Sequence, residues 1–211
     1  MDKYNIEIEL KSETILGSGE SVPGSVDLEV LYDNYGLPYL KGKTLKGRLR
    51  EEAENIIRLD NKTFNKKDID ELFGYENKNE FNKIIFFDAT VSENVKNAIN
   101  EAINNSSIEK EDIFNALTDT RIFTSIGKDG VAVDTTLRQI RVIHKGLILN
   151  AKINIVFDLS EKEEVLLALS VASLKHIGLM CNRGKGNVVC VLYKNGKEIL
   201  NDSIEKYKGE K

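Results

Sequence analysis

The sequence predicts an α+β protein, a ferredoxin-like or RRM-like βαββαβ domain with inserted helices and a projecting hairpin. Residues 4–10 alternate between apolar and polar side chains, which is the period of a half-buried strand. Ser160-Glu-Lys-Glu163 is a capping box and opens the most clearly marked helix of the chain. Strand and helix patterns follow in the order strand, helix, strand, insertion, strand, helix, strand, as in a split βαβ domain. No internal repeat is visible, so residues 1–211 are expected to form a single domain.

Local signals define the elements of the N-terminal half. After the first strand come a turn-rich loop at 17–24 and an extended arm at 26–32. A helix is expected over residues 45–59, because its apolar side chains share one face and Thr44 can act as its N-cap. Residues 84–90 are apolar enough for a strand in the middle of the sheet.

Three segments have the polarity and turn signals of insertions. They lie at about 60–82, 92–118 and 121–143. The second should contain short amphipathic helices at 94–103 and 108–117. The third has β-type residues on both sides of Gly127-Lys-Asp-Gly130, and this turn signal predicts the projecting hairpin.

The C-terminal half is expected to contain a strand, a helix and a last strand, at residues 147–159, 161–177 and 187–193. Gly178 should end the helix. Residues 197–211 are expected to form a polar, mobile tail.

A helix with a basic start follows a turn in Gly36-Leu-Pro-Tyr-Leu-Lys-Gly-Lys-Thr-Leu-Lys-Gly-Arg-Leu-Arg50. Positive side chains at a helix N-terminus oppose the macrodipole, at about 0.3–1 kcal/mol each. A phosphate bound at free N–H groups there would make the same charges favourable. The residues expected to bind it are Lys41, Lys43, Lys46, Arg48 and Arg50. The alternative is a solvated helix end beside a loop.

A glycine-rich loop, Gly178-Leu-Met-Cys-Asn-Arg-Gly-Lys-Gly186, forms the second candidate site. Its glycines allow close backbone approach to a phosphate, and its basic residues supply charge. The residues expected to contact the ligand are Arg183, Gly184, Lys185 and Gly186. The loop lacks the Gly-Lys-Ser/Thr ending of a P-loop, which argues against nucleotide binding. The alternative is a helix end followed by a tight turn into a strand.

The charge balance restricts the partners. The net charge of −4 argues against a general nucleic-acid binder, but the basic residues are segregated. A third basic cluster contains Arg138, Arg141 and Lys145. Local basic faces can bind phosphates on an acidic protein.

Several classes of site and location are disfavoured. Two cysteines and two histidines have no zinc spacing, so a structural metal is not expected. The N-terminus lacks a signal-peptide core and no apolar run reaches membrane length, so a cytoplasmic protein without membrane contact is expected. The aromatic signature of RNA stacking on an RRM sheet is also absent, which favours phosphate contacts at loops and helix ends.

Four stretches, in this order, resemble the RAMP superfamily, the RNA-binding subunits of CRISPR effector complexes. They are Gly36-Leu-Pro-Tyr39 with Gly42 to Arg50, Leu72-Phe-Gly74 with the strand ending Phe87-Asp-Ala89, Val131-Ala-Val-Asp134 with Leu137-Arg138, and Gly178 to Gly186. The likeness covers about residues 10–190 and looks closest to subunits of the III-D branch. Lys41 departs from the pattern, since many members have a second proline there.

The resemblance implies a ribonucleoprotein subunit for antiviral defence. Its partners would be guide RNA, the target RNA paired with it, and other effector subunits. The hairpin would be a thumb that reaches across the guide toward a neighbouring subunit.

Asp27 lies where RNA-cleaving members of that family keep their catalytic aspartate. With a divalent metal (Mg²⁺ or Mn²⁺) shared with the RNA as cofactor, the chain would be a metal-dependent endoribonuclease. In the alternative, Asp27 closes a turn through backbone hydrogen bonds and the chain is a non-catalytic scaffold paralogue. A ferredoxin-like protein that binds a phosphorylated small molecule would also explain the basic loops.

Overall fold

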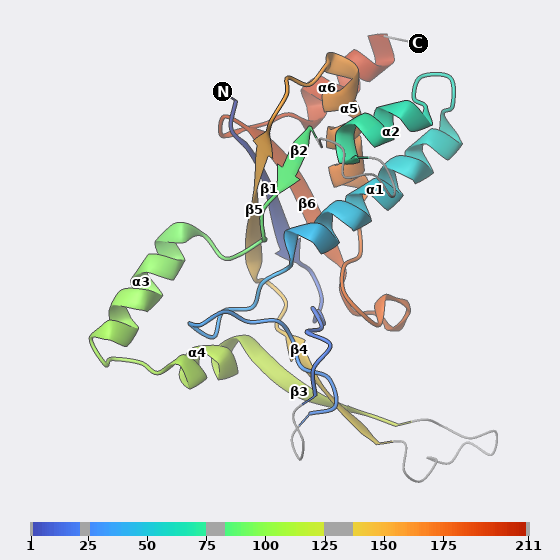
Figure 1. The fold of residues 1–211 in the computed structure, drawn as a ribbon. Coiled ribbons are helices and arrows are strands. Elements are labelled where there is room, and N and C mark those ends of the chain that lie inside the picture. The colour runs from blue at the N-terminus through green and yellow to red at the C-terminus, as the bar shows by residue number, and fades with distance from the viewer. Residues whose placement is uncertain (1, 22–25, 75–82, 125–136, 210–211) are drawn as a thin grey trace, which may run out of the picture.

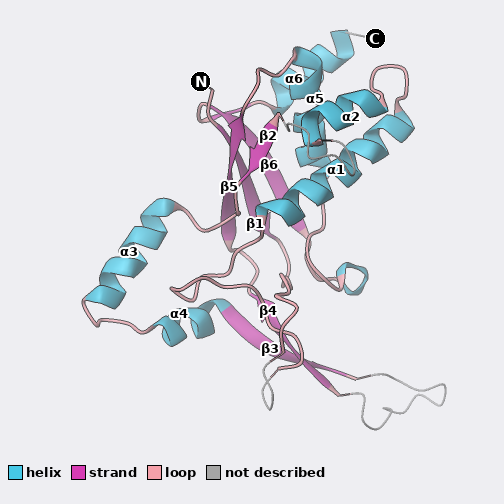
Figure 2. Ribbon diagram, viewed as in Figure 1, coloured by secondary structure: helices cyan, strands magenta, loops and turns pink. Residues whose placement is uncertain are grey.

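The computed structural model describes residues 2–21, 26–74, 83–124 and 137–209, and its centre is a five-stranded sheet (Figures 1 and 2). The strand order is β2–β5–β1–β6–β7. The strands are β1 (Tyr4–Leu10), β2 (Ile84–Phe86), β5 (Ile148–Ile155), β6 (Val188–Lys194) and β7 (Lys197–Glu198). β1 is central, with Tyr4 opposite Ile153 of β5 on one side and Lys194 of β6 on the other.

Helices cover one face of the sheet, and the core lies between the two layers (Figure 1). They are α1 (Gly42–Leu59), α2 (Lys66–Phe73), α5 (Glu161–Ser173) and α6 (Leu200–Gly209). The alternation in β1 places Ile6 and Ile8 in this core, where both are fully buried. Leu45 and Leu49, one turn apart on α1, are buried in the same cluster. Each such side chain contributes about 1.5–3 kcal/mol through removal from water.

The predicted fold class is confirmed by the connections. α1 joins β1 to β2, with β5 between them in the sheet, and α5 joins β5 to β6, with β1 between them. Two such split βαβ units, interleaved, make the ferredoxin-like α+β domain.

The hairpin projects from this domain, as the sequence predicts (Figure 2). It consists of β3 (Thr118–Phe123) and β4 (Arg138–Ile143). Its turn at 127–130 and the stretch 131–134 lie outside the described residues. The extended arm lies along β4, where Leu28 pairs with Ile140. The two helices expected in the preceding insertion are α3 (Glu93–Asn104) and α4 (Lys110–Leu117), and α3 stands away from the sheet (Figure 1).

Helix α1 begins earlier than expected, at Gly42, and its N-cap is Lys41 rather than Thr44. The Gly42 amide donates to Asp88 Oδ1 at 2.8 Å, which fixes the first residue of the helix against the segment after β2. A Cβ at Gly42 would collide with the backbone carbonyl of Phe86, so only glycine allows this close approach.

The C-terminal half differs from the prediction in two places. Helix α5 ends at Ser173 rather than 177, and the chain then runs extended, with His176 pairing with Asn187. The expected mobile tail instead forms β7 and helix α6, which packs on α5 with Ile199 and Ser203 buried. Among the described residues no helix is long and apolar enough to cross a bilayer.

Candidate nucleic-acid interface

The start of α1 presents three lysine side chains outward. Lys41 and Lys43 are exposed, Lys46 is half-buried, and none of the three forms an ion pair within the described part of the chain. Burial, followed by the charge of Arg50, lowers the pKa of Lys46. Because no carboxylate neutralises them, these lysines are available to an anion.

Three of the first four backbone amides of this helix already have acceptors within the protein, which narrows the expected phosphate site to the Lys43 amide and the lysine side chains. Gly42 donates to the Asp88 carboxylate, and the amides of Thr44 and Leu45 donate to Lys41 O at 2.9 and 3.0 Å. Asp88 also brings a negative charge to the positive end of the helix dipole. The lysine side chains and the Lys43 amide, and not these three amides, are what the helix start offers to a ligand.

Arg50 has a structural position, unlike the lysines before it. Its side chain is 15% exposed and donates to Asp70 Oδ1 at 2.6 Å and to the Gly74 carbonyl, while Nε lies 3.4 Å from Glu54. These contacts tie α1 to the middle of α2, at Asp70, and to its C-cap, Gly74. Arg50 is therefore held in the packing of α1 against α2 and is less available to a ligand than the lysines before it.

Arg48 lies between these two cases. It forms an ion pair with Glu51 at 2.5 Å on the same helix, and its Nη2 lies 3.4 Å from His176 O. The second contact brings the first turns of α1 beside the segment that leads into the glycine-rich loop.

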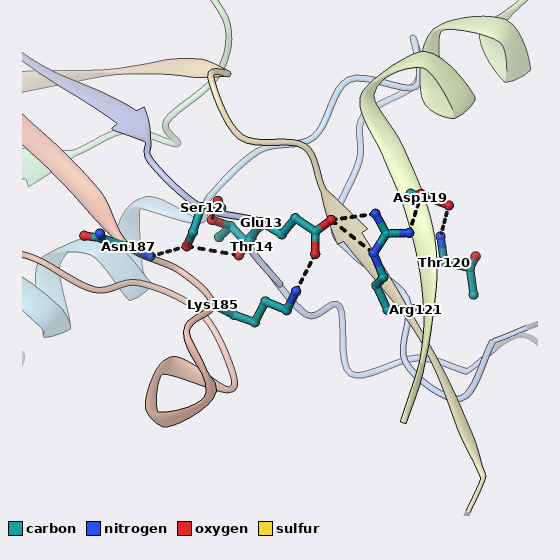
Figure 3. Close-up of polar contacts among 8 residues, drawn as sticks. All are labelled: Ser12, Glu13, Thr14, Asp119, Thr120, Arg121, Lys185 and Asn187. Carbon is teal, nitrogen blue, oxygen red and sulfur yellow. Dashed lines mark hydrogen bonds and ion pairs between the residues drawn. The ribbon is translucent and has the colours of Figure 1, made fainter. Parts of the chain in front are cut away.

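The glycine-rich loop contains one free cation and one paired cation. Arg183 is exposed and unpaired within the described ranges, whereas Lys185 forms an ion pair with Glu13 (Figure 3). Gly184, at φ +74°, faces open space. Gly186, at φ +71°, lies against the Ile177 carbonyl, where a Cβ would collide. The loop thus offers Arg183 and Gly184 to a ligand, while Lys185 and Gly186 hold its shape.

A groove of about 580 Å³ brings Arg183 together with Arg138 of the hairpin. The arm contributes Leu28, β3 contributes Phe123, and the loop contributes Leu179, which is 46% exposed. Arg138 is exposed and has no ion pair in the described structure. The groove therefore combines two free guanidinium groups with apolar walls, a surface suited to phosphates with bases beside them.

Asp27 precedes Leu28, which lines this groove, and is held by β4. Its amide donates to Gln139 O at 2.8 Å, and its Oδ2 accepts from the Gln139 amide at 2.7 Å. Asp27 is exposed, and its second carboxylate oxygen has no partner among the described residues. Asp33, the other acid of the arm, instead accepts from the Tyr35 amide and pairs with Lys96 at 3.1 Å.

The residues around Asp27 do not form a metal site by themselves. In the described part of the chain no group of three or more His, Cys, Asp or Glu could hold a metal ion. One free carboxylate oxygen on an exposed side chain fits a metal that takes most of its ligands from RNA and water.

Glu13 is the residue of this region that sequence reasoning missed. Its carboxylate accepts from Arg121 of β3 at 2.6 Å and from Lys185 of the loop (Figure 3). These partners lie 108 and 172 residues further along the chain, so no local pattern could have indicated them.

Comparison with known proteins places this geometry in a family. The family model for the RAMP superfamily matches residues 7–189. One similar solved structure is a chain of a type III-B Cmr-beta complex bound to cognate target RNA, with 14% identity, a TM-score of 0.65, and coverage of 96% of this chain and 98% of that one. Another is from the same kind of complex in its apo state, with 14% identity, a TM-score of 0.68, and coverage of 93% and 99%.

At this identity the two structures establish likeness of fold, and no protein with a curated description matches the chain. The family model covers most of the length of the chain. Within the split βαβ domain, the projecting hairpin precedes the glycine-rich loop, as expected. The chain therefore belongs to the RAMP superfamily.

Proposed function

We propose that this chain is a subunit of a type III CRISPR effector complex and that it binds guide RNA along its phosphate backbone. The observation that carries the proposal is the groove where Arg138 and Arg183 meet, both unpaired within the described residues of a protein with net charge −4. Lys41 and Lys43 would extend this surface along the start of α1, which Arg48 joins to the loop through His176. RNA phosphates are the ligand that such spaced single cations suit.

Salt dependence of RNA binding tests this proposal. Arg138→Ala, Arg183→Ala and Lys43→Ala should each weaken binding for all sequences alike and reduce the slope of log K against log salt by about 0.7–0.9. Lys197→Ala is the charge-matched control, because Lys197 lies on β7, where it pairs with Asp202. Slopes that stay at the wild-type value in all three variants would remove this surface from the interface.

RNA length separates the proposal from binding of a phosphorylated metabolite. An extended backbone site should show affinity that rises with oligonucleotide length until the groove and helix start are both covered. A small-molecule site should bind a nucleoside monophosphate as tightly as an oligonucleotide.

Partner subunits test the type of complex. We also propose that this complex belongs to the III-D branch and that the hairpin acts as a thumb toward a neighbouring subunit. Affinity purification of this chain from cells that naturally produce it should recover guide RNA together with other effector subunits. Recovery of the chain alone, free of nucleic acid, would contradict an effector role.

A second activity, cleavage of target RNA, is supported by Asp27. Its place beside Leu28 in the arm, against Gln139 of β4, and its one free carboxylate oxygen suit a divalent metal, Mg²⁺ or Mn²⁺, that also binds the scissile phosphate. Such a metal would favour attack by the neighbouring 2′-hydroxyl.

Two substitutions separate charge from structure at Asp27. Asp27→Asn keeps an acceptor for the Gln139 amide and removes the charge, whereas Asp27→Ala removes both. In the assembled complex both should abolish metal-dependent cleavage, and Asp27→Asn should retain wild-type RNA affinity. Cleavage by Asp27→Asn at the wild-type rate, or wild-type cleavage in EDTA, would leave the chain as a scaffold.

A further inference from the structure

Glu13 connects three segments that are far apart in sequence. Its Oε1 accepts two hydrogen bonds from Arg121 on β3, from Nη2 at 2.6 Å and Nε at 3.1 Å, while its Oε2 pairs with Lys185 in the glycine-rich loop. Figure 3 shows the carboxylate between the two cations. One side chain therefore links the hairpin, the segment after β1 and the loop.

The backbone around Glu13 is held on both sides. Thr14 exchanges two hydrogen bonds with Ile143 of β4, at 3.0 and 2.8 Å. Glu13 O accepts from the Gly186 amide at 2.9 Å, and Ile15 O accepts from Leu179 at 3.0 Å. The segment thus lies between the base of the hairpin and the loop, and the Glu13 carboxylate adds a contact with β3.

The charges of this cluster cancel. Arg121 also pairs with Asp119, so that two carboxylates face two cations. The hydrogen bonds from Arg121, and then the one from Lys185, hold the pKa of Glu13 below its ordinary value, and the carboxylate stays charged at neutral pH. A balanced cluster leaves no net charge for a phosphate, which favours a positioning role over direct RNA contact.

We propose that Glu13 is a positioning residue that fixes the hairpin relative to the glycine-rich loop, so that Arg138 and Arg183 act on one segment of RNA together. The inference rests on the proposed function. Two cations on a rigid frame bind RNA as one preorganised site, because the second phosphate contact is intramolecular once the first has formed. Two cations on elements that move independently bind their phosphates separately. The same two elements also contribute apolar side chains to the groove, Phe123 from β3 and Leu179 from the loop.

The geometric part of the proposal is tested without RNA. Spin labels at Ile122→Cys, which is 62% exposed on β3, and Asn182→Cys in the loop report the distance between the two elements. Cys181→Ser removes the nearby thiol and retains a hydrogen-bonding group. Glu13→Gln should broaden the distance distribution, whereas the control Glu9→Gln, which breaks only the exposed pair with Lys11, should leave it narrow.

The functional part is tested by a double-mutant cycle for RNA binding. In the wild-type background, the fold-loss of RNA affinity in the double variant Arg138→Ala/Arg183→Ala should differ by about two- to tenfold from the product of the fold-losses in the two single variants. In the Glu13→Gln background, the two fold-losses of RNA affinity should simply multiply. Arg121→Gln should give the same result, because it removes the partner of Glu13. The salt slope of Glu13→Gln itself should equal that of the wild type, since Glu13 touches no phosphate.

The failures of the two proposals are distinguishable. A wild-type protein that shows no salt-dependent RNA binding refutes the proposed function and, with it, this inference. A wild-type protein that binds RNA, with coupling and label distances unchanged in Glu13→Gln, overturns the positioning role alone. A salt slope that rises by about one unit or more in Glu13→Gln also overturns it, because Glu13 would then be masking Lys185 and Arg121 from the RNA.

Discussion

Arg50→Ala separates the two roles that the basic stretch of α1 combines. Arg50 belongs to the sequence motif expected to bind phosphate, yet its guanidinium contacts Asp70 and the Gly74 carbonyl. Removing it should therefore destabilise the protein and leave the salt dependence of RNA binding unchanged. Lys43→Ala, from the exposed start of the same helix, should do the reverse.

The expected magnitude follows from burial. The Arg50 and Asp70 side chains are 15% and 13% exposed. Breaking a buried pair costs about 3–5 kcal/mol, whereas an exposed pair is worth about 0–1 kcal/mol. A pair that is mostly but not fully buried should lie near the lower end of the buried range, at about 3 kcal/mol, because Asp70 loses its partner and the Gly74 carbonyl its donor. For a chain of this length the Tm should fall by about 6–12 °C.

Urea unfolding and a salt titration of RNA binding, measured on the same samples, provide the assay. Arg58→Ala is the matched control, because Arg58 carries the same charge in the last turn of α1 and is exposed without an ion pair in the described structure. It should change the free energy of unfolding by at most about 1 kcal/mol. The reasoning is refuted if Arg50→Ala unfolds at the wild-type midpoint while its salt slope falls by about one unit.

Three further predictions concern the loop and its surroundings. Gly184→Ala should lower the free energy of unfolding by about 1–2 kcal/mol through the positive φ alone. Gly186→Ala should lower it clearly more, since the added Cβ would also meet a backbone carbonyl. Equal losses of stability in thermal unfolding would contradict this. Burial raises the pKa of Cys190 to about 12, so iodoacetamide at about pH 8 should modify Cys181 in the native protein and Cys190 only after denaturation, as read by mass spectrometry. The pKa of Glu13 in the folded protein is lowered by its arginine partner and then by its lysine partner. Its contribution to stability is therefore present at a pH above its ordinary pKa of 4.5 and is lost as the pH falls through the lower pKa of the folded state. Glu13→Gln should accordingly flatten the decline of the unfolding free energy below about pH 4.5, and an unchanged decline would contradict the linkage.

The parts of the fold that were predictable depend on short-range signals. The alternation of residues 4–10 became β1 without change, because a period of two fixes which side chains face the core. The capping box at Ser160 is present, with the Glu163 amide donating to the serine hydroxyl and the glutamate side chain accepting from the Ser160 amide. The strand and helix order that follows from such signals was sufficient to specify the split βαβ fold.

The parts that were missed depend on contacts between distant residues. Thr44 is a reasonable N-cap by local rules, but Asp88, 46 residues after Gly42, moves the helix start to that glycine. Arg50 and Lys43 have the same charge in the same motif, and only the position of Asp70 separates their roles.

The candidate site shows the same division. Arg138 and Arg183 were each identified as candidates, while the groove that joins them follows only from the packing of the hairpin beside the loop. The C-terminal tail was too polar to predict as a packed element, because the surface that buries Ile199 and Ser203 belongs to α5.

The central position of β1 has a consequence for how the protein is made. β1 leaves the ribosome well before its neighbours β5 and β6, which end only at Ile155 and Lys194. Until both have been synthesised, the nascent chain carries an apolar strand with two unpaired edges, which is the arrangement most prone to pairing with other chains. Assembly of the sheet should therefore be slow and should not be complete before β6 has been synthesised. Co-expression with chaperones, or with the other subunits of the proposed complex, should raise the soluble yield.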